Sequence, residues 1–252
     1  MSHNMALTIH IGDDSFIATA EPLSQQAFAP FGDVVANPRP HVHPSAYPAH
    51  AASLPAGAQS ANQGSAIQYR RASRIRSLYP QAPSRRAEPI ASVFVCAARP
   101  LSAVAGSHQA AQRLTVRVLE RHPFTTQTFS PLASSATRYL VIVAPSLPPS
   151  PHDRHLPVPA GPDLPGRGLP DLTALRAFVA TSAQAVTYAA GTWHAPMVVL
   201  GPPGSTLDFV VTQFASGVAT EDCQLVEFES RGSVDPRVEV RIPNVTSTMA
   251  KL

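Results

Sequence analysis

The chain has 252 residues, 44 % of them apolar and 14 % charged, which allows a sizeable core beneath an unusually uncharged surface. The basic side chains behind the net charge of +3 are almost all arginines, most of them placed singly, so we expect no basic stripe for nucleic acid. Lys251 is the only lysine, which excludes Schiff-base enzymes and any GxxxxGK phosphate loop. The uncharged run over 177–207 is interrupted by Thr, Ser, Gln, Pro and Gly, so it predicts no membrane span.

The termini and cysteines predict where the protein resides. The first fourteen residues lack a basic region followed by an apolar core, so we expect no secretory signal. Cys96 and Cys223 lie far apart without CxxC spacing and are expected to be reduced thiols of an intracellular protein. The tripeptide Ala250-Lys251-Leu252 differs from the SKL signal by one residue, which predicts a peroxisomal protein, and otherwise a cytoplasmic one.

Prolines cluster at about 38–60, 80–90 and 145–170, where they exclude helix interiors and central strands. We expect surface loops there, inserted into a single domain spanning 1–252 with a C-terminal tail over about 230–252. Their histidines are expected to be solvent-exposed, namely His41, His43, His50, His152 and His155.

Between these loops lie short segments rich in Val, Phe, Tyr and Thr, which predict strands at 16–23, 92–98, 113–122, 126–129, 138–144, 185–190, 197–201, 207–214 and 224–228. A helical turn is expected at 24–32. One helix is predicted at about 171–181, where Asp171 can cap an apolar stripe of Leu172, Leu175 and Phe178/Val179. Many strands and few helices favour a mainly β fold, an antiparallel barrel or sandwich.

The predicted strand 113–122 carries the first polar pair. Alternation places Leu114, Val116, Val118, Glu120 and His122 on one inward face. A buried carboxylate needs a partner, so we expect Glu120 to meet a metal, His122 or a substrate group. Arg121 points the other way and is expected to serve a dimer contact.

The second polar feature is His194, within "YAAGTWHAPMVVLG" (188–201). Alone, a histidine among apolar neighbours is usually a core residue. The spacing of Glu120, His122 and Gln127, followed by Gly191 and His194, resembles the two metal motifs of cupin barrels. Glu stands for the first His, Gln for the Glu and Ala189 for a Pro, so the ligand set is weaker than the cupin one.

The blocks "PLSQQAFAPFGDVV", "ANQGSAIQY", "SVFVCAARP", "LERHPFTTQTFSPL", "YAAGTWHAPMVVLG" and "LDFVVTQFASGVATEDCQLVEF" together resemble the ureidoglycolate lyase family, formerly called ureidoglycolate hydrolase. The resemblance covers about 20 to 228. It implies a cupin-like antiparallel β-barrel, a homodimer, and cleavage of (S)-ureidoglycolate to glyoxylate and urea in allantoin (purine) catabolism.

This chemistry needs a base for the substrate hydroxyl and an acid for the departing urea nitrogen. We expect Glu120 and His122 in these roles, with His194 and Gln127 orienting the substrate. The same four residues would hold any divalent metal ion, and no organic cofactor is expected. A guanidinium should bind the substrate carboxylate. The predicted substrate-binding residues are Tyr69, Arg70, Arg71 and Trp193.

Two other readings stay open. A metal-dependent cupin oxygenase or isomerase would need firmer ligation than this set provides. A cupin-like small-molecule binding protein would keep the fold and the polar cluster without needing an acid–base pair.

Overall fold

A computed structural model describes residues 6–103, 112–230 and 236–243, and every element below lies in these ranges. Strands dominate the described chain and its helices are single turns, so the predicted mainly β fold class is confirmed. Among the described residues no helix has the length and apolar character to span a bilayer. The tripeptide Ala250-Lys251-Leu252 lies outside the described residues.

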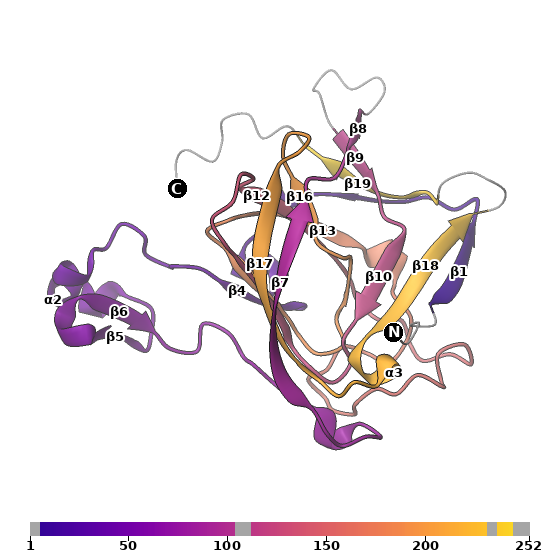
Figure 1. Ribbon diagram of the computed structural model, residues 1–252, viewed down its shortest axis with the longest axis horizontal. Helices are drawn as coiled ribbons and strands as arrows, with labels where there is room; N and C mark the ends of the chain where they lie inside the picture. Colours follow the sequence, from indigo (N-terminus) through magenta and orange to yellow (C-terminus); the bar gives the residue numbers. More distant parts are fainter. Residues whose placement is uncertain (1–5, 104–111, 231–235, 244–252) are drawn as a thin grey trace.

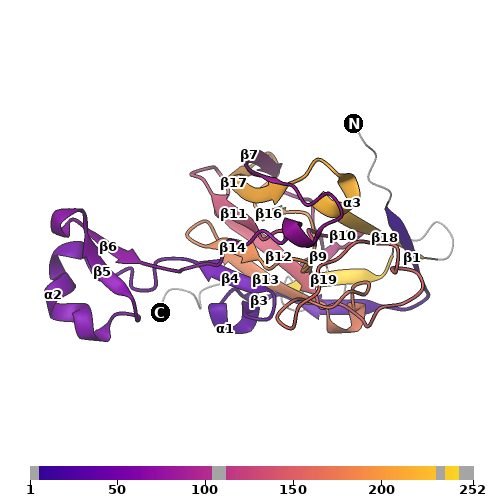
Figure 2. The ribbon, with the colours of Figure 1, turned by 90° about the horizontal axis from the view of Figure 1, so that it is seen from below.

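The strands form three larger sheets and one small one (Figures 1 and 2). The central sheet has eight strands: β1 Leu7–Gly12, β18 Gln224–Ser230, β10 Val118–Arg121, β15 Trp193–His194, β12 Arg138–Ala144, β13 Arg176–Thr181, β3 Glu21–Pro22 and β16 Val198–Leu200. The five-stranded sheet contains β4 Gly32–Val35, β14 Ala185–Tyr188, β11 Gln127–Pro131, β17 Thr206–Ala215 and β7 Glu88–Ala97. The four-stranded sheet contains β2 Phe16–Thr19, β19 Val238–Ile242, β9 Gln112–Thr115 and β8 Ser102–Ala103.

The remaining elements are short. A two-stranded sheet pairs β5 Ala58–Ala61 with β6 Ala66–Tyr69. The helical turns are α1 Gln25–Phe28, η1 Pro44–Ala46, α2 Tyr47–His50, η2 Ala51–Ser53, η3 Asn62–Gly64, η4 Tyr79–Gln81, η5 Leu172–Ala174 and α3 Ala219–Asp222. The turn α1 confirms the helical turn predicted at 24–32, and Ser24 caps it by accepting from the Ala27 amide.

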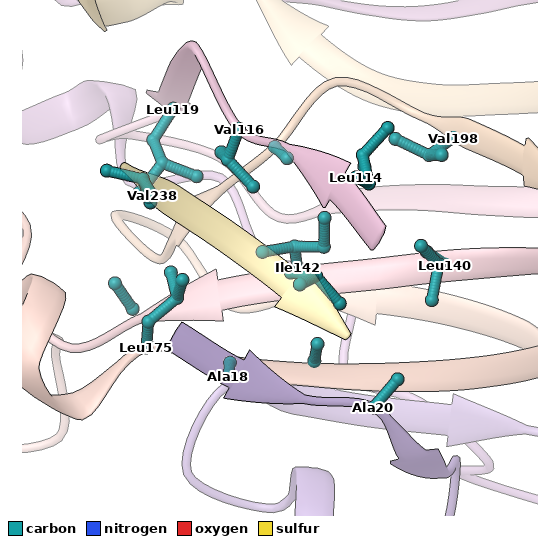
Figure 3. Close-up of a cluster of buried hydrophobic side chains, with 14 of the residues drawn as sticks. Ala18, Ala20, Leu114, Val116, Leu119, Leu140, Ile142, Leu175, Val198 and Val238 are labelled. Atoms are coloured by element: carbon teal, nitrogen blue, oxygen red, sulfur yellow. The ribbon is translucent and has the colours of Figure 1, made fainter. Parts of the chain in front are cut away.

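The central sheet is the middle layer of the molecule. Alternate residues of β12 enter two different cores: Leu140 and Ile142 pack with the four-stranded sheet in the first core, while Val141 and Val143 pack with the five-stranded sheet in the second. Figure 3 shows the first core, where β12 lies beside the strands that carry Ala18 and Val238. A strand covered on both faces is apolar at every position, which explains the unbroken "YLVIVA" of β12.

The predicted antiparallel barrel is not closed, because strand pairing leaves the sheets open. The central sheet ends at β1 and β3, and the five-stranded sheet ends at β4 and β7. Most pairs are antiparallel as predicted, but β1 with β18, β3 with β13 and β2 with β19 are parallel. The described chain therefore stacks three open sheets through two cores.

The predicted helix at 171–181 is also wrong. Asp171 does cap a turn, accepting from the Thr173 amide, but that turn ends at Ala174 and Arg176–Thr181 is strand β13. Phe178 faces the second core while Ala177 and Val179 face the first. A short apolar run buried on both faces fits helical spacing as well as strand spacing, so periodicity alone cannot separate them.

The predicted strand 113–122 divides in two. Strand β9 belongs to the four-stranded sheet and β10 to the central sheet, with the crossing at Val116 and Arg117. Leu119 therefore joins Leu114 in the first core, and Glu120 faces the opposite side. The prediction that Glu120 shares a face with Leu114 and Val116 is wrong, whereas its shared face with His122 is retained.

The Pro-rich segments are more ordered than predicted. Residues 37–72 form a lobe that projects from the sheets (Figures 1 and 2), and it contains η1, α2, η2, η3 and the β5–β6 pair. The 80–90 segment includes the end of η4 and the start of β7, and the predicted C-terminal tail contains β19. Residues 145–170 hold no helix or strand, as expected, although Asp153 and Leu156 are buried there.

Arg121 holds the 145–170 loop against the central sheet through hydrogen bonds to loop carbonyls. Its side chain is fully buried and donates to the Gln224 side chain at 2.8 Å and to the carbonyls of Gly168 and Arg167 at 3.0 and 3.1 Å. Its guanidinium carbon lies 4.4 Å from the ring centroid of Trp193, a cation–π distance. The predicted role of Arg121 in a dimer contact is wrong, because its donors are used within the chain.

We expect Arg121→Leu to loosen the 145–170 loop and to lower the free energy of unfolding by about 2–4 kcal/mol, because it leaves buried acceptors without donors. Limited proteolysis should cut the variant within 145–170 faster than the wild type. Arg138→Leu removes an exposed arginine from the central sheet and is the matched control. Equal cleavage of all three proteins would contradict this account.

Candidate active site

Two adjacent strands of the central sheet bring three polar side chains together. Glu120 on β10 lies directly opposite His194 on β15, so both point toward the five-stranded sheet. His122 follows Glu120 by two residues. The Nε2 atoms of His194 and His122 lie 3.7 and 4.0 Å from Glu120 Oε1. One ligand atom from each residue lies within 4.8 Å of the others, so this trio could hold a metal ion.

Backbone carbonyls fix the tautomer of both imidazoles. His122 Nδ1 lies 2.6 Å from the Asp222 carbonyl, and His194 Nδ1 lies 2.9 Å from the Thr192 carbonyl. A carbonyl can only accept, so each Nδ1 carries the proton and each neutral ring has its lone pair on Nε2. Both Nε2 atoms are buried without a hydrogen-bond partner. This arrangement is the one that histidine metal ligands have in proteins.

His194 is enclosed more tightly than His122. Its side chain is 2 % exposed, and the Tyr188 ring stacks on it with a centroid separation of 4.0 Å. Burial, with the neighbouring His122 adding to it, lowers the pKa of His194 to about 3. His194 is therefore neutral at physiological pH and presents a lone pair, so it cannot serve as a proton donor through Nε2.

Glu120 is the accessible member of the trio, with a side chain 20 % exposed. Its Oε2 lies 3.7 Å from Cys223 Sγ, a thiol contact that leaves Oε1 facing the imidazoles. Burial, and then the Glu120 charge, raise the pKa of Cys223 to about 12, so the thiol keeps its proton. Cys223 was predicted only as a reduced thiol, and no sequence motif indicated its contact with Glu120.

Gln127 lies on β11 of the facing sheet. Its Nε2 donates to Gln213 Oε1 at 2.6 Å, and its buried Oε1 has no partner among the described residues. It pairs in register with Tyr188, whose ring covers His194. Gln127 therefore lines the layer between the sheets in which the trio lies, with an unused acceptor.

The structure does not bring the predicted substrate-binding residues to the trio. Tyr69, Arg70 and Arg71 lie at the end of β6, on the projecting lobe and away from β10 in both views (Figures 1 and 2). Trp193 faces the first core, on the opposite side of the central sheet from His194, and its Nε1 donates to the Gly168 carbonyl. The prediction that Trp193 binds substrate is therefore wrong, because the residue is fully buried in the core.

Two acidic residues near the trio stabilise its surroundings. Asp222, whose carbonyl holds His122, accepts from the Tyr79 hydroxyl at 2.6 Å and from the Ser216 amide at 2.7 Å. Glu221 is buried and accepts from the Ser84 amide and hydroxyl. These contacts fix α3 against the segment near residues 79–84. In the sequence, the only indication of these contacts is the pair of acidic residues within "TEDCQ" (220–224).

Comparison with known proteins gives a consistent result. Residues 15–235 match the model of the ureidoglycolate lyase family. The ureidoglycolate lyase of Schizosaccharomyces pombe is 35 % identical over 213 residues, which cover 84 % of this chain and 91 % of that protein. That of Saccharomyces cerevisiae is 34 % identical over 202 residues, covering 78 % and 85 %, and that of Burkholderia cepacia is 30 % identical over 197 residues, covering 77 % and 78 %.

The lowered pKa of His194 predicts a loss of stability in mild acid. The folded state keeps His194 neutral down to about pH 3, whereas the unfolded chain protonates it near pH 6.5. Protons therefore favour the unfolded state as the pH falls below 6.5, by about 2 kcal/mol at pH 5. Urea unfolding of chelator-treated protein at pH 7, 6 and 5 should show this decline, and His194→Gln should flatten it.

The matched control is His10→Gln, which removes an exposed histidine and should leave the pH dependence as in the wild type. An unchanged slope in His194→Gln would mean that other groups cause the decline.

Proposed function

Because the chain belongs to the ureidoglycolate lyase family, we propose that it cleaves (S)-ureidoglycolate to glyoxylate and urea, a step of allantoin catabolism. The observation that carries the proposal is the trio, in which a partly exposed carboxylate and the lone pairs of two buried imidazoles lie within 4.8 Å of one another. The substrate has a hydroxyl, a carboxylate and a ureido nitrogen on one carbon. Its cleavage moves a proton from the hydroxyl to that nitrogen while the carbon–nitrogen bond breaks.

Glu120 and His122 take the acid–base roles in this proposal. The Glu120 carboxylate accepts the hydroxyl proton, and the electrons of the O–H bond form the glyoxylate carbonyl as the carbon–nitrogen bond breaks. The neutral His122 Nε2, 4.0 Å from Oε1, takes this proton from Glu120 and delivers it to the departing nitrogen, so both side chains end as they began. No covalent intermediate is needed. His194 and Gln127 orient the substrate through unused acceptors.

We also propose that the trio binds one divalent metal ion. The residues fit, because both Nε2 lone pairs are unpaired and face a carboxylate, and Gln127 has a spare oxygen nearby in the layer. When bound, such an ion supplies Lewis acidity toward the hydroxyl and carboxylate oxygens of the substrate. The residues that would hold it are His122, His194 and Glu120, with Gln127 completing the set.

A homodimer is part of the proposal, and its support is the family resemblance. Substrate binding by Tyr69, Arg70 and Arg71 also stays in the proposal. These residues lie on the lobe, away from the trio of their own chain.

We expect Glu120→Gln and His122→Asn to fold normally and to lose about 10²–10⁴-fold in kcat, the usual worth of a positioned acid or base. The measurement is glyoxylate release from ureidoglycolate in a coupled assay. Glu227→Gln is the matched control, because Glu227 is exposed on β18 and pairs with Val118 at the far end of β10. Near-wild-type kcat in both site variants would overturn the assignment, and a wild type that releases no glyoxylate would favour the binding-protein alternative.

For the metal, we expect elemental analysis to find about one divalent ion per chain, and His194→Gln to retain it at least about tenfold less tightly, because one of three strong donors is lost. His10→Gln should retain the ion as the wild type does. Full activity after complete removal of metal would contradict the metal proposal and leave the trio as a purely organic acid–base site.

A further inference from the structure

The lobe of residues 37–72 is structurally separate from the sheets of its own chain. All of its hydrogen bonds among the described residues close within it, such as Tyr47 to the Ala58 carbonyl and Arg39 to the Ser53 carbonyl. Both views show it projecting on the side of β4, apart from β10 and α3 (Figures 1 and 2). An ordered element that projects in this way is suited to meet another molecule.

The backbone of the lobe is strained where the predicted binding residues lie. Four non-glycine residues in the described ranges have positive φ, and three of them are on the lobe: Asn62, Gln63 and Arg71 at 49°, 57° and 60°. Such conformations cost free energy and cluster at functional sites. Arg70 is tied to Gln68, whereas Arg71 is exposed and has no hydrogen-bond or ion-pair partner among the described residues.

The trio itself contains no guanidinium for the carboxylate of the proposed substrate. The ion pairs that Glu120 makes within the described chain are to His122 and His194. Arg121, its neighbour in sequence, points into the first core and is fully used there. A carboxylate is bound best by a guanidinium, which can donate two parallel hydrogen bonds.

Charge favours a second copy as the molecule that the lobe meets. The lobe, residues 37–72, contains three arginines and no Asp or Glu, so it is cationic. The cationic lobe of one chain is complementary to the Glu120 carboxylate in the trio of another, and a two-fold axis satisfies both contacts at once.

We propose that the lobe of each chain completes the active site of a second copy, where Arg71 binds the substrate carboxylate. This inference rests on the proposed function, since it assigns the residue that recognises the substrate of that reaction. It accounts together for the projecting lobe and for the strained, exposed Arg71, which has no partner among the described residues of its own chain.

The first test is Arg71→Ala, for which we expect a rise in KM of about 10- to 100-fold, the loss of a charge-assisted pair, with a smaller effect on kcat. Arg39→Ala removes the same charge from the exposed surface of the same lobe and should leave KM unchanged. Circular dichroism checks that both variants are folded. A wild-type KM in Arg71→Ala would overturn the proposal.

The second test distinguishes delivery by a partner from delivery within one chain. A chain with Glu120→Gln and a chain with Arg71→Ala carry different affinity tags, are co-expressed and are isolated as the mixed dimer. One of its two sites then combines an intact trio with an intact Arg71 from the other chain. We expect about half of the wild-type kcat/KM per dimer, against little in either parent.

A mixed dimer no more active than its parents would place Arg71 in its own chain's site and overturn the proposal. So would light scattering that finds a fully active wild-type protein with the mass of one chain at micromolar concentration. A wild-type dimer that binds ureidoglycolate without releasing glyoxylate would instead contradict the proposed function. Loss of that binding in Arg71→Ala, regained in the mixed dimer, would still support the shared site.

Discussion

The burial of the middle of the central sheet on both faces is the constraint on which the rest of the structure depends. Where β12 and β15 lie between the two cores the sheet has no solvated side, so a polar side chain there must find a partner within the protein. β10 and β15 lie in the middle of that sheet and carry Glu120, His122 and His194. The Asp222 and Thr192 carbonyls satisfy one nitrogen of each ring, and Cys223 contacts one carboxylate oxygen. What remains unsatisfied is a set of acceptors that face one another.

These unsatisfied acceptors explain why this location can bind a ligand or take part in proton transfer. Desolvation disfavours the imidazolium form of His194, and the stacked Tyr188 ring excludes water from it. Converging acceptors without a donor between them are an incomplete hydrogen-bond network, which is costly in a low-dielectric layer. A proton, a metal ion or a substrate hydroxyl placed among them would relieve that cost. The unsatisfied acceptors left by folding therefore favour the binding of such a group.

The sequence predicted the mainly β fold class and the clustering of three polar side chains, but not the pairing of the sheets around them. Spacing brought Glu120, His122 and His194 together correctly, because strand alternation is a local property that survives a break upstream at Val116 and Arg117. The barrel could not be excluded, since sheet closure depends on pairings distant in the chain. Strand β13 fitted a helical stripe because both of its faces are buried. For Trp193 and Arg121, strand alternation correctly predicted that each side chain points away from the trio. It could not predict that the two side chains contact each other and the 145–170 loop.

The lobe shows what the prolines contribute. Two large apolar side chains, Val42 and Leu54, are buried within it, which is far too little core for about 36 residues to offset their conformational entropy. Each proline at a compatible position removes about 0.4–1 kcal/mol of that entropy from the unfolded chain. The prolines therefore stabilise the lobe by restricting its unfolded state and partly compensate for its small core. Contacts with a second copy would supply the remaining stabilisation. In the proposed dimer, the lobe holds Arg71 at a fixed place only after the two chains have assembled. Recognition of the substrate carboxylate would then depend on the dimer, while the three residues of the trio come from one chain.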